Sequence, residues 1–249
     1  MQRFKNKYQD KNHKDTFSNV QKCLRLNDLK EIGDSTHYLI FNMLGLFSFR
    51  DLSLQETINF WLLFTKEINN YPDYITIHPD KKEWVNLYPK DMEIRFDDEC
   101  IWSDGVIGGY CTEFYKNDVE IGNIVNTLGD CIDVGFGCER LLVNMISSDK
   151  PSKSEILKDT IEVLINSNIT LSNNKQGYIL KKLLVDFVLS GGNMNNKEFE
   201  IVKKNQINVY ENYKKMKLKN KYKNKDSYWW LDTIGIDENK INLYEKLEF

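Results

Sequence analysis

The spacing of apolar residues changes once along this chain, near residue 150, and that change limits the folds open to it. Before it, stretches such as "YITIH" (74–78) and "VEIGNIVN" (119–126) alternate apolar and polar residues, as half-buried strands do. After it, "EILKDTIEVLI" and "GYILKKLLVDFVL" repeat apolar residues at helical spacing. We predict an α+β chain, with an antiparallel sheet and helices in residues 1–150 and a helical domain in residues 151–249.

Local signals place individual elements in the first domain. Residues 1–19 are polar and turn-like, "VQKCLR" (20–25) is typical of a short strand, and "HYLIFNMLGLFSF" (37–49) indicates a buried strand and turn. Ser53 and Glu56 have the spacing of a capping box, which predicts that a helix begins there.

The composition excludes several classes of function. A net charge of −3 and a pI near 5.8 give no general attraction to nucleic acid, so any such contact must be local. No apolar run is long enough to span a membrane, and "MQRFKNKYQDKNHKD" lacks the apolar core of a secretory signal. The five cysteines form no CxxC pair, and the three histidines lie far from them in sequence. We therefore expect a reduced, cytoplasmic chain without membrane contact or a protein-built metal cage.

The segment "CIDVGFGCERLL" combines an acid, two glycines and a base. It alternates like a strand as far as Gly137, and a helix is expected over 138–145. Gly135 and Gly137 remove side chains from one face, so another group can approach the backbone there. Arg140 lies in the first helical turn, where the helix dipole favours an anion, and Asp133 could hold a cation such as an amino group. An amino-acid-activating enzyme requires such a pair of sites.

Arginine is rare in this chain, so the positions at which it occurs bear on function. Only five of the 34 basic residues are arginine. Two of the five are Arg25 and Arg140. Lysine cannot replace a planar, bidentate guanidinium, so an arginine that persists in a lysine-rich chain indicates recognition of a phosphate or a carboxylate.

The Gly-Phe-Gly segment resembles motif 3 of the class II aminoacyl-tRNA synthetases, and most specifically the V-D-T-G-M-G-L-E-R pattern of the alanyl-tRNA synthetase family. Six further segments resemble that family in the same order along the chain. They are "QKCLR-LNDLKEIG" (21–33), "FNMLGLFSFRD" (41–51), "CIW…CTEFY" (100–115), "VEIGNIV" (119–125), "LSNNKQGYILKKLL" (171–184) and "WWLDTIGID" (229–237). The resemblance implies the class II antiparallel sheet flanked by helices, followed by a helical domain.

The resemblance also implies an ATP site that works with Mg²⁺. Arg25 would hold the α-phosphate and the carboxylate-derived oxygen, and Arg140 the terminal phosphate. Phe41 would lie against the adenine, and Asp28 would belong to the same ATP site. In-line displacement at phosphorus mainly needs positioning and charge neutralisation, which suits arginines and magnesium better than a nucleophilic side chain.

The amino-acid pocket implied by the resemblance holds Trp102, Glu113, Asn123, Asp133 and Gly135. Asp133 would bind the α-amino group and Trp102 would form a wall.

In the helical domain, the resemblance assigns recognition of the acceptor stem of alanine tRNA to Asn173 and Asp232.

The chain departs from the family pattern in several places. Its N-terminus resembles sequence just after motif 1, so motif 1 is expected to be absent, and so are the editing and C-terminal domains beyond Phe249. The motif 2 loop is shortened to "RLND" and has lost its lysine. Thr36 stands where the family has an arginine. The basic helix expected to face tRNA reads "KKLLVDFVL". Each loss removes charge from an ATP or tRNA contact, which would slow activation.

Simpler structural interpretations stay open for each candidate. Asp133 and Arg140 could form an ordinary ion pair at a strand–helix corner, and Trp102 and Phe41 could be core residues. Asn173 and Asp232 could be a helix cap and a turn residue, and the cysteines could be buried and inert.

Three functions follow from the residues and the resemblance. The first is activation of alanine, or another small amino acid, and its transfer to tRNA. The second is an adenylating paralogue that passes the aminoacyl group to a carrier protein, a peptide or a small-molecule amine; the thinned basic helix favours it. The third is a non-catalytic synthetase-like binding protein, which the retained Arg25, Asp133 and Arg140 disfavour.

Overall fold

A computed structural model of the protein describes residues 4–34, 36–145, 151–222 and 224–247. The chain divides into two compact units, which are described separately. The first consists of Met1–Lys30 and Thr36–Asp149, and the second of Glu31–Ser35 and Lys150–Phe249.

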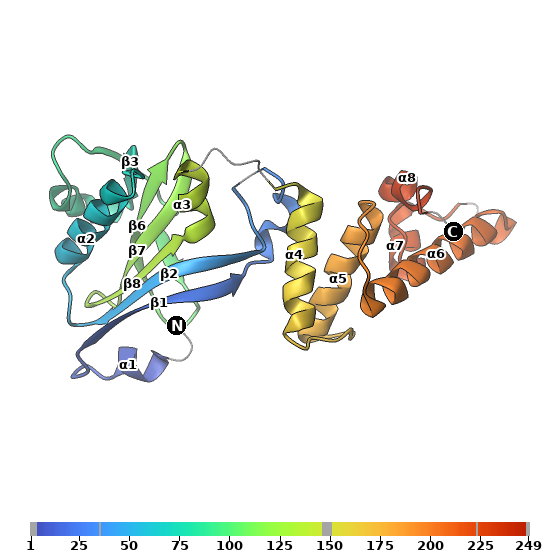
Figure 1. Cartoon of the computed structure of the whole chain (residues 1–249), viewed down its shortest axis with the longest axis horizontal. Helices are drawn as coiled ribbons and strands as arrows, with labels where there is room; N and C mark the ends of the chain where they lie inside the picture. Colours follow the sequence, from blue (N-terminus) through green and yellow to red (C-terminus); the bar gives the residue numbers. More distant parts are fainter. Residues whose placement is uncertain (1–3, 35, 146–150, 223, 248–249) are drawn as a thin grey trace. The chain divides into compact units, whose positions relative to one another are not determined.

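The first unit is built around an eight-stranded sheet with helices (Figure 1). Its strands are β1 (Asp15–Leu24), β2 (Ile40–Phe49), β3 (Tyr74–Ile77), β4 (Glu93–Phe96), β5 (Ile101–Ser103), β6 (Gly108–Lys116), β7 (Val119–Thr127) and β8 (Cys131–Gly137). Its helices are α1 (Lys5–Gln9), α2 (Leu54–Glu67) and α3 (Cys138–Met145), with the 3-10 helices η2 (Asn27–Lys30) and η3 (Pro79–Leu87).

The strands follow the order β1-β2-β8-β7-β6-β3-β4, and β5 pairs with β6 outside this path. Neighbouring strands are antiparallel except β3 and β4, which are parallel. The predicted α+β class with an antiparallel sheet is confirmed. The short strands β4 and β5 were not predicted.

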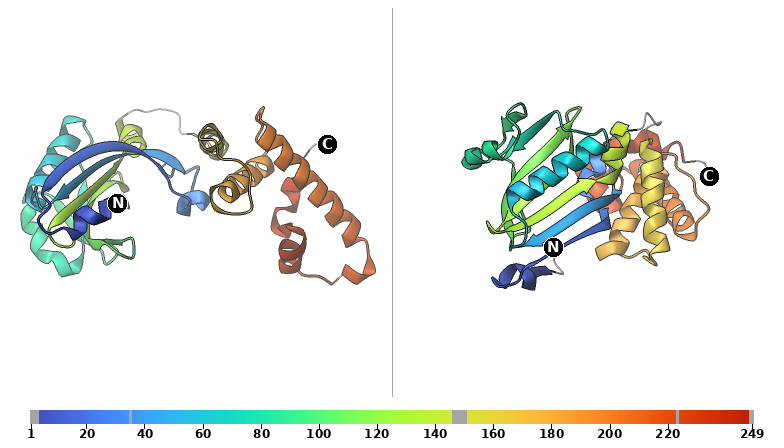
Figure 2. Two further views of the ribbon diagram at one scale, coloured as in Figure 1. Left: turned by 90° about the horizontal axis from the view of Figure 1, so that it is seen from below. Right: turned by 60° about the vertical axis from the view of Figure 1, so that its left-hand side comes forward.

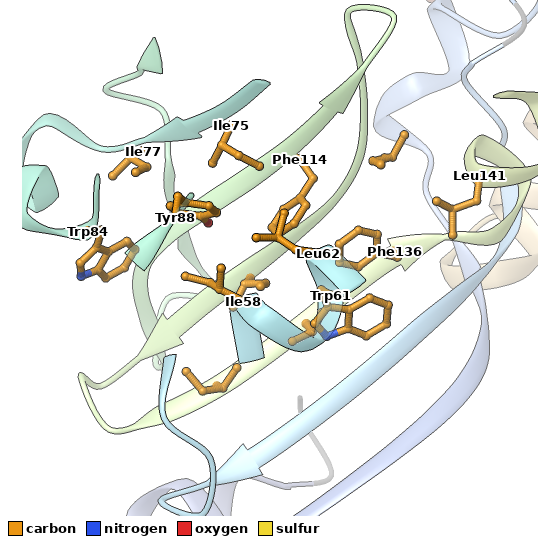
Figure 3. Close-up of a cluster of buried hydrophobic side chains, with 14 residues drawn as sticks. Ile58, Trp61, Leu62, Ile75, Ile77, Trp84, Tyr88, Phe114, Phe136 and Leu141 are labelled. Atoms are coloured by element: carbon orange, nitrogen blue, oxygen red, sulfur yellow. The ribbon is translucent and has the colours of Figure 1, made fainter. Parts of the chain in front are cut away.

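Helix α2 covers one face of the sheet (Figure 2, right). Ser53 and Glu56 form the predicted capping box, with both reciprocal hydrogen bonds present. The buried side of the helix places Trp61 against Phe136 of β8, with parallel rings whose centroids lie 4.3 Å apart. Figure 3 shows this apolar cluster, in which the side chain of Phe114 on β6 packs with residues of the helix. Burial of this cluster fixes α2 on the sheet.

The prediction for the N-terminal residues is wrong. Residues 5–9 form α1, and the first strand begins at Asp15 and pairs with β2 over ten positions instead of starting at residue 20. Seven of its ten residues are exposed, since β1 lies at the sheet edge. Such a strand lacks the apolar alternation used to recognise strands. The predicted turn within 37–49 is also absent, because β2 runs without interruption from Ile40 to Phe49.

The second unit is helical, as its periodicity predicts. Its helices are α4 (Lys153–Asn166), α5 (Lys175–Leu189), α6 (Lys197–Lys217), α7 (Ser227–Ile234) and α8 (Ile241–Tyr244), with the 3-10 helices η4 (Asn220–Tyr222) and η5 (Glu238–Lys240). Helix α5 contacts both α4 and α6. Phe187 of α5 lies edge-on to Phe199 of α6, with ring centroids 5.9 Å apart, so these helices share an apolar core.

No helix in the described part of the chain has the length and apolar character needed to cross a membrane.

Candidate active site

Five of the predicted site residues lie on the face of the sheet opposite α2. Directly paired residues on neighbouring strands project to the same face. Glu113 pairs with Asn123, and Asn123 pairs with Gly135. Asp133 shares this face because it lies two residues before Gly135, and Phe41 does so by the register of β2 with β8. The residues between them point toward α2 and form the core, so each strand separates core residues from candidate site residues.

A cavity opens on this face. It brings together five of the predicted residues, namely Arg25, Phe41, Asn123, Gly135 and Arg140. Its full lining is Arg25, Thr36, Tyr38, Phe41, Met43, Glu120, Ile121, Gly122, Asn123, Gly135, Gly137, Glu139 and Arg140. Residues from both ends of the first unit's sequence therefore meet at one site.

The two glycines of the Gly-Phe-Gly segment leave the floor of the cavity free of side chains. A Cβ atom added to Gly135 would lie 3.0 Å from the sulfur of Met43, and one added to Gly137 would lie 3.7 Å from the side chain of Arg140. Any larger side chain at either position would enter the cavity. The absence of these side chains lets a ligand reach the backbone of β8.

Arg140 is held at the cavity wall by other groups of the protein. Its Nε donates to the carbonyl oxygen of Thr36 at 3.2 Å, and its Nη1 donates to the carbonyl oxygen of Glu120 at 2.9 Å. The same nitrogen lies 3.2 Å from the Glu120 carboxylate. Arg140 thus forms an ion pair, but its partner is Glu120 and not Asp133. An anion that enters the cavity would share this guanidinium with Glu120.

Glu139 is a cavity residue to which the sequence assigned no role. Its carboxylate accepts hydrogen bonds from the backbone N–H of Asn42, at 3.0 and 2.9 Å, and from its side-chain amide at 3.0 Å. These hydrogen bonds hold the start of α3 against β2. The only sequence signal was its position directly before Arg140, and nothing in the sequence indicated Asn42 as its partner.

Asp133 lies on the same face as the cavity but outside its lining. Burial raises the pKa of this carboxyl from 3.8 to about 7. Burial raises the pKa of the Tyr8 phenol, and the charge of the nearby Asp133 raises it further. A positively charged amino group beside Asp133 would restore the ionised carboxylate, because an opposite charge lowers the pKa of an acid.

Trp102 and Glu113 also lie outside the cavity lining. Trp102 packs against Cys100, Cys111 and Val125, so it behaves at least in part as a core residue. Glu113 accepts hydrogen bonds from the hydroxyls of Thr76 (3.2 Å) and Tyr115 (3.0 Å), and burial, followed by the charge of Glu120, raises its pKa.

The remaining candidates are Asp28, Asn173 and Asp232. The side chain of Asp28 lies outside the described part of the structure. Asn173 and Asp232 belong to the second unit, where both are exposed. Asn173 accepts a hydrogen bond from the amino group of Lys181 at 3.2 Å, and no hydrogen bond joins Asn173 to Asp232 among the described residues.

The cavity has the donor set expected for a magnesium-bound nucleotide. Two guanidinium groups, from Arg25 and Arg140, suit phosphate oxygens. Two carboxylates, from Glu120 and Glu139, suit a hard cation, and the ring of Phe41 can stack on a base.

The chain is similar to known class II tRNA synthetases. Residues 1–106 match the family model described as tRNA synthetases class II (A). An alanine–tRNA ligase of Desulfitobacterium hafniense is 34% identical over 133 residues, which cover 49% of this chain and 15% of that protein. An alanine–tRNA ligase of Prochlorococcus marinus is 30% identical over 250 residues, covering 70% of this chain and 28% of that protein. One from Tropheryma whipplei is 28% identical over 235 residues, covering 66% and 27%.

The chain thus spans between 15% and 28% of the length of these three relatives.

Proposed function

Because the chain is a relative of the class II alanine–tRNA ligases, we propose that it activates a small amino acid, alanine first, with ATP and transfers it to tRNA. The observation that supports this most is the meeting of Arg25, Phe41, Asn123 and Arg140 around one glycine-floored cavity. These residues are distant in sequence, and each matches a motif of that family.

In the proposed first step, an oxygen of the amino-acid carboxylate bonds to the α-phosphorus of ATP, and the bond to pyrophosphate breaks. Arg25 neutralises charge at the α-phosphate, and Arg140 binds the terminal phosphate of the leaving group. Phe41 stacks on the adenine. In the second step a ribose hydroxyl of tRNA attacks the carbonyl carbon of the adenylate, and AMP leaves.

Magnesium, when bound, would neutralise the negative charge of the phosphates. The carboxylates of Glu120 and Glu139 would hold it, since both line the cavity and carboxylate oxygens suit this cation.

The amino acid would occupy the same face of the sheet, beyond the cavity. Its ammonium group would pair with Asp133, whose burial favours such a partner. Asn123 and Gly135 would connect this position to the nucleotide, because both line the cavity. Trp102 and Glu113 would form the outer wall.

Pyrophosphate exchange tests the first step. The purified protein is incubated with ATP, labelled pyrophosphate and a panel of amino acids. We expect exchange with alanine or another small amino acid. Arg140→Ala should lower the rate by about 100-fold or more, because a charge-stabilising donor in the transition state is lost. Arg95→Ala is the matched control, since Arg95 lies on β4 and pairs with Glu93 outside the cavity. Absence of exchange with every amino acid would refute the proposal.

The acceptor needs a separate test, because transfer to a carrier protein, a peptide or an amine would start from the same adenylate. The lysine beside Asn173 supports a tRNA acceptor, whereas Asp186 in α5 adds negative charge to a helix that is basic in the family. Aminoacylation of tRNA is measured for the wild type and for Asn173→Ala and Asp232→Ala. We expect both variants to lose charging while exchange is unchanged. Exchange without tRNA charging would instead support a different acceptor.

A further inference from the structure

Two thiols and a carboxyl group meet beside Trp102, on the face of the sheet opposite α2, which we call the open face. The Sγ atoms of Cys100 and Cys111 and a carboxylate oxygen of Glu113 all lie within 4.8 Å of one another. Both cysteines are buried, at 0% and 2% exposure. They lie side by side across the β5–β6 pairing, where the N–H of Cys111 donates to the carbonyl of Cys100 at 2.9 Å.

The separations suit a tetrahedral zinc site. With zinc–sulfur bonds of about 2.3 Å, two thiolates on a tetrahedron lie about 3.8 Å apart. The Sγ of Cys111 already lies 3.8 Å from Oε1 of Glu113. Side-chain movements of about 1 Å would therefore bring all three ligands to bonding distance of one ion, without a change in the strand register.

The hydroxyl group of Thr76 forms hydrogen bonds with two of the three ligands, and its bond to Glu113 does not depend on a thiol proton. The thiol of Cys100 donates to Oγ1 of Thr76 at 3.0 Å, and the same hydroxyl donates to Oε2 of Glu113 at 3.2 Å. Tyr115 donates to the same carboxylate oxygen at 3.0 Å. Hydrogen bonds of this kind orient the ligands of protein metal sites.

The charge around the cluster also favours a cation. The negatively charged side chains of Glu120 and Asp97 lie close to Glu113. In the described part of the chain, no lysine or arginine forms an ion pair with this carboxylate. A metal ion would supply the missing positive charge.

We propose that Cys100, Cys111 and Glu113 bind one zinc ion, with the fourth tetrahedral position left for water or a small-molecule ligand. Two thiolates select zinc over magnesium or calcium, which prefer oxygen ligands. Zinc displaces the two thiol protons when it binds. Three protein ligands with one open position are typical of a zinc site that contacts substrate and not of a structural one.

Zinc content of the full-length protein tests this proposal. The protein is kept in a phosphine reductant to exclude a disulfide, incubated with zinc, and dialysed before metal analysis. We expect close to one zinc per chain in the wild type, and loss of most of it in Cys100→Ser and Cys111→Ser. Cys131→Ser is the matched control, because Cys131 is equally buried but lies in another cluster, and it should keep its zinc. Circular dichroism establishes that each variant is folded.

Cobalt provides a second readout that does not depend on the cysteine variants. Co²⁺ added to the reduced wild-type protein should give the absorption of thiolate-bound tetrahedral cobalt. Glu113→Gln and Thr76→Val should each weaken cobalt binding by at least about tenfold. A wild-type protein that binds neither zinc nor cobalt, or cysteine variants that keep as much zinc as Cys131→Ser, would overturn the proposal.

Discussion

The two faces of the sheet in the first unit are made by the same strands but have opposite character. On the face toward α2, alternate residues such as Phe114, Ile124 and Phe136 are fully buried. On the other face, their neighbours Glu113, Asn123 and Gly135 are polar or small. The difference shows how an alternating strand serves two purposes. Residues on the face toward α2 stabilise the fold. Residues on the other face contribute less to the core, so polar and small side chains that suit ligand binding are tolerated there.

The largest expected effect is on the covered face. Phe136 is fully buried and stacks on Trp61. Phe136→Ala should lower the free energy of unfolding by about 3–5 kcal/mol, because it removes a buried aromatic ring and leaves a cavity. Urea denaturation would measure this loss. Asn123 pairs with Gly135, the residue before Phe136, and lies on the open face. Asn123→Ala should lower the free energy of unfolding by no more than about 1 kcal/mol. Equal losses for the two variants would contradict the division between the faces.

A smaller effect, which depends on pH, is expected for Asp133 on the open face. Its pKa in the folded protein is about 7, against 3.8 when unfolded. Between these values the folded state binds a proton that the unfolded state does not, so this group lowers stability as the pH rises from about 4 to 7. Asp133→Asn lacks this effect. The variant should gain stability relative to the wild type on going from pH 5 to pH 8, by on the order of 2 kcal/mol after screening by water.

Thermal or urea unfolding of both proteins at the two pH values measures this gain. A stability difference that is the same at pH 5 and pH 8 would show that Asp133 does not titrate in this range. In the wild type, binding of an amino acid through its ammonium group should strengthen as the pH rises toward 7, since only the carboxylate form can pair with it.

The smallest effect distinguishes two glycines on opposite faces. A Cβ atom on Gly122 would lie 2.3 Å from the ring of Phe136, whereas one on Gly135 would lie 3.0 Å from the flexible side chain of Met43. We expect Gly122→Ala to cost about 1–2 kcal/mol through overpacking of the core, and Gly135→Ala to cost less while weakening nucleotide binding. Urea denaturation and ATP titration would separate the two effects, and a larger stability loss for Gly135→Ala would reverse the assignment.

Much of the fold could be predicted because its signals are local. The capping box at Ser53 and Glu56 fixed the start of α2, and α3 covers the predicted residues 138–145. Residue alternation separated the two faces of β6, β7 and β8. Residues 15–19 of the edge strand β1 were not predicted, because its exposed residues carry no apolar alternation.

The sequence by itself determined which residues could carry the proposed chemistry: the glycines of the Gly-Phe-Gly segment, Asp133, Arg25 and Arg140. Capping, alternation and motif spacing depend on residues a few positions apart, so they can be read directly from the chain. Only the tertiary structure decided that Glu120 binds Arg140 and that Glu139 binds Asn42, 97 positions away. It also brought Cys100, Cys111 and Glu113 together, although no ligand spacing in the sequence predicted a metal site. These contacts depend on strand register and on which strands become neighbours, and burial of the whole core sets both.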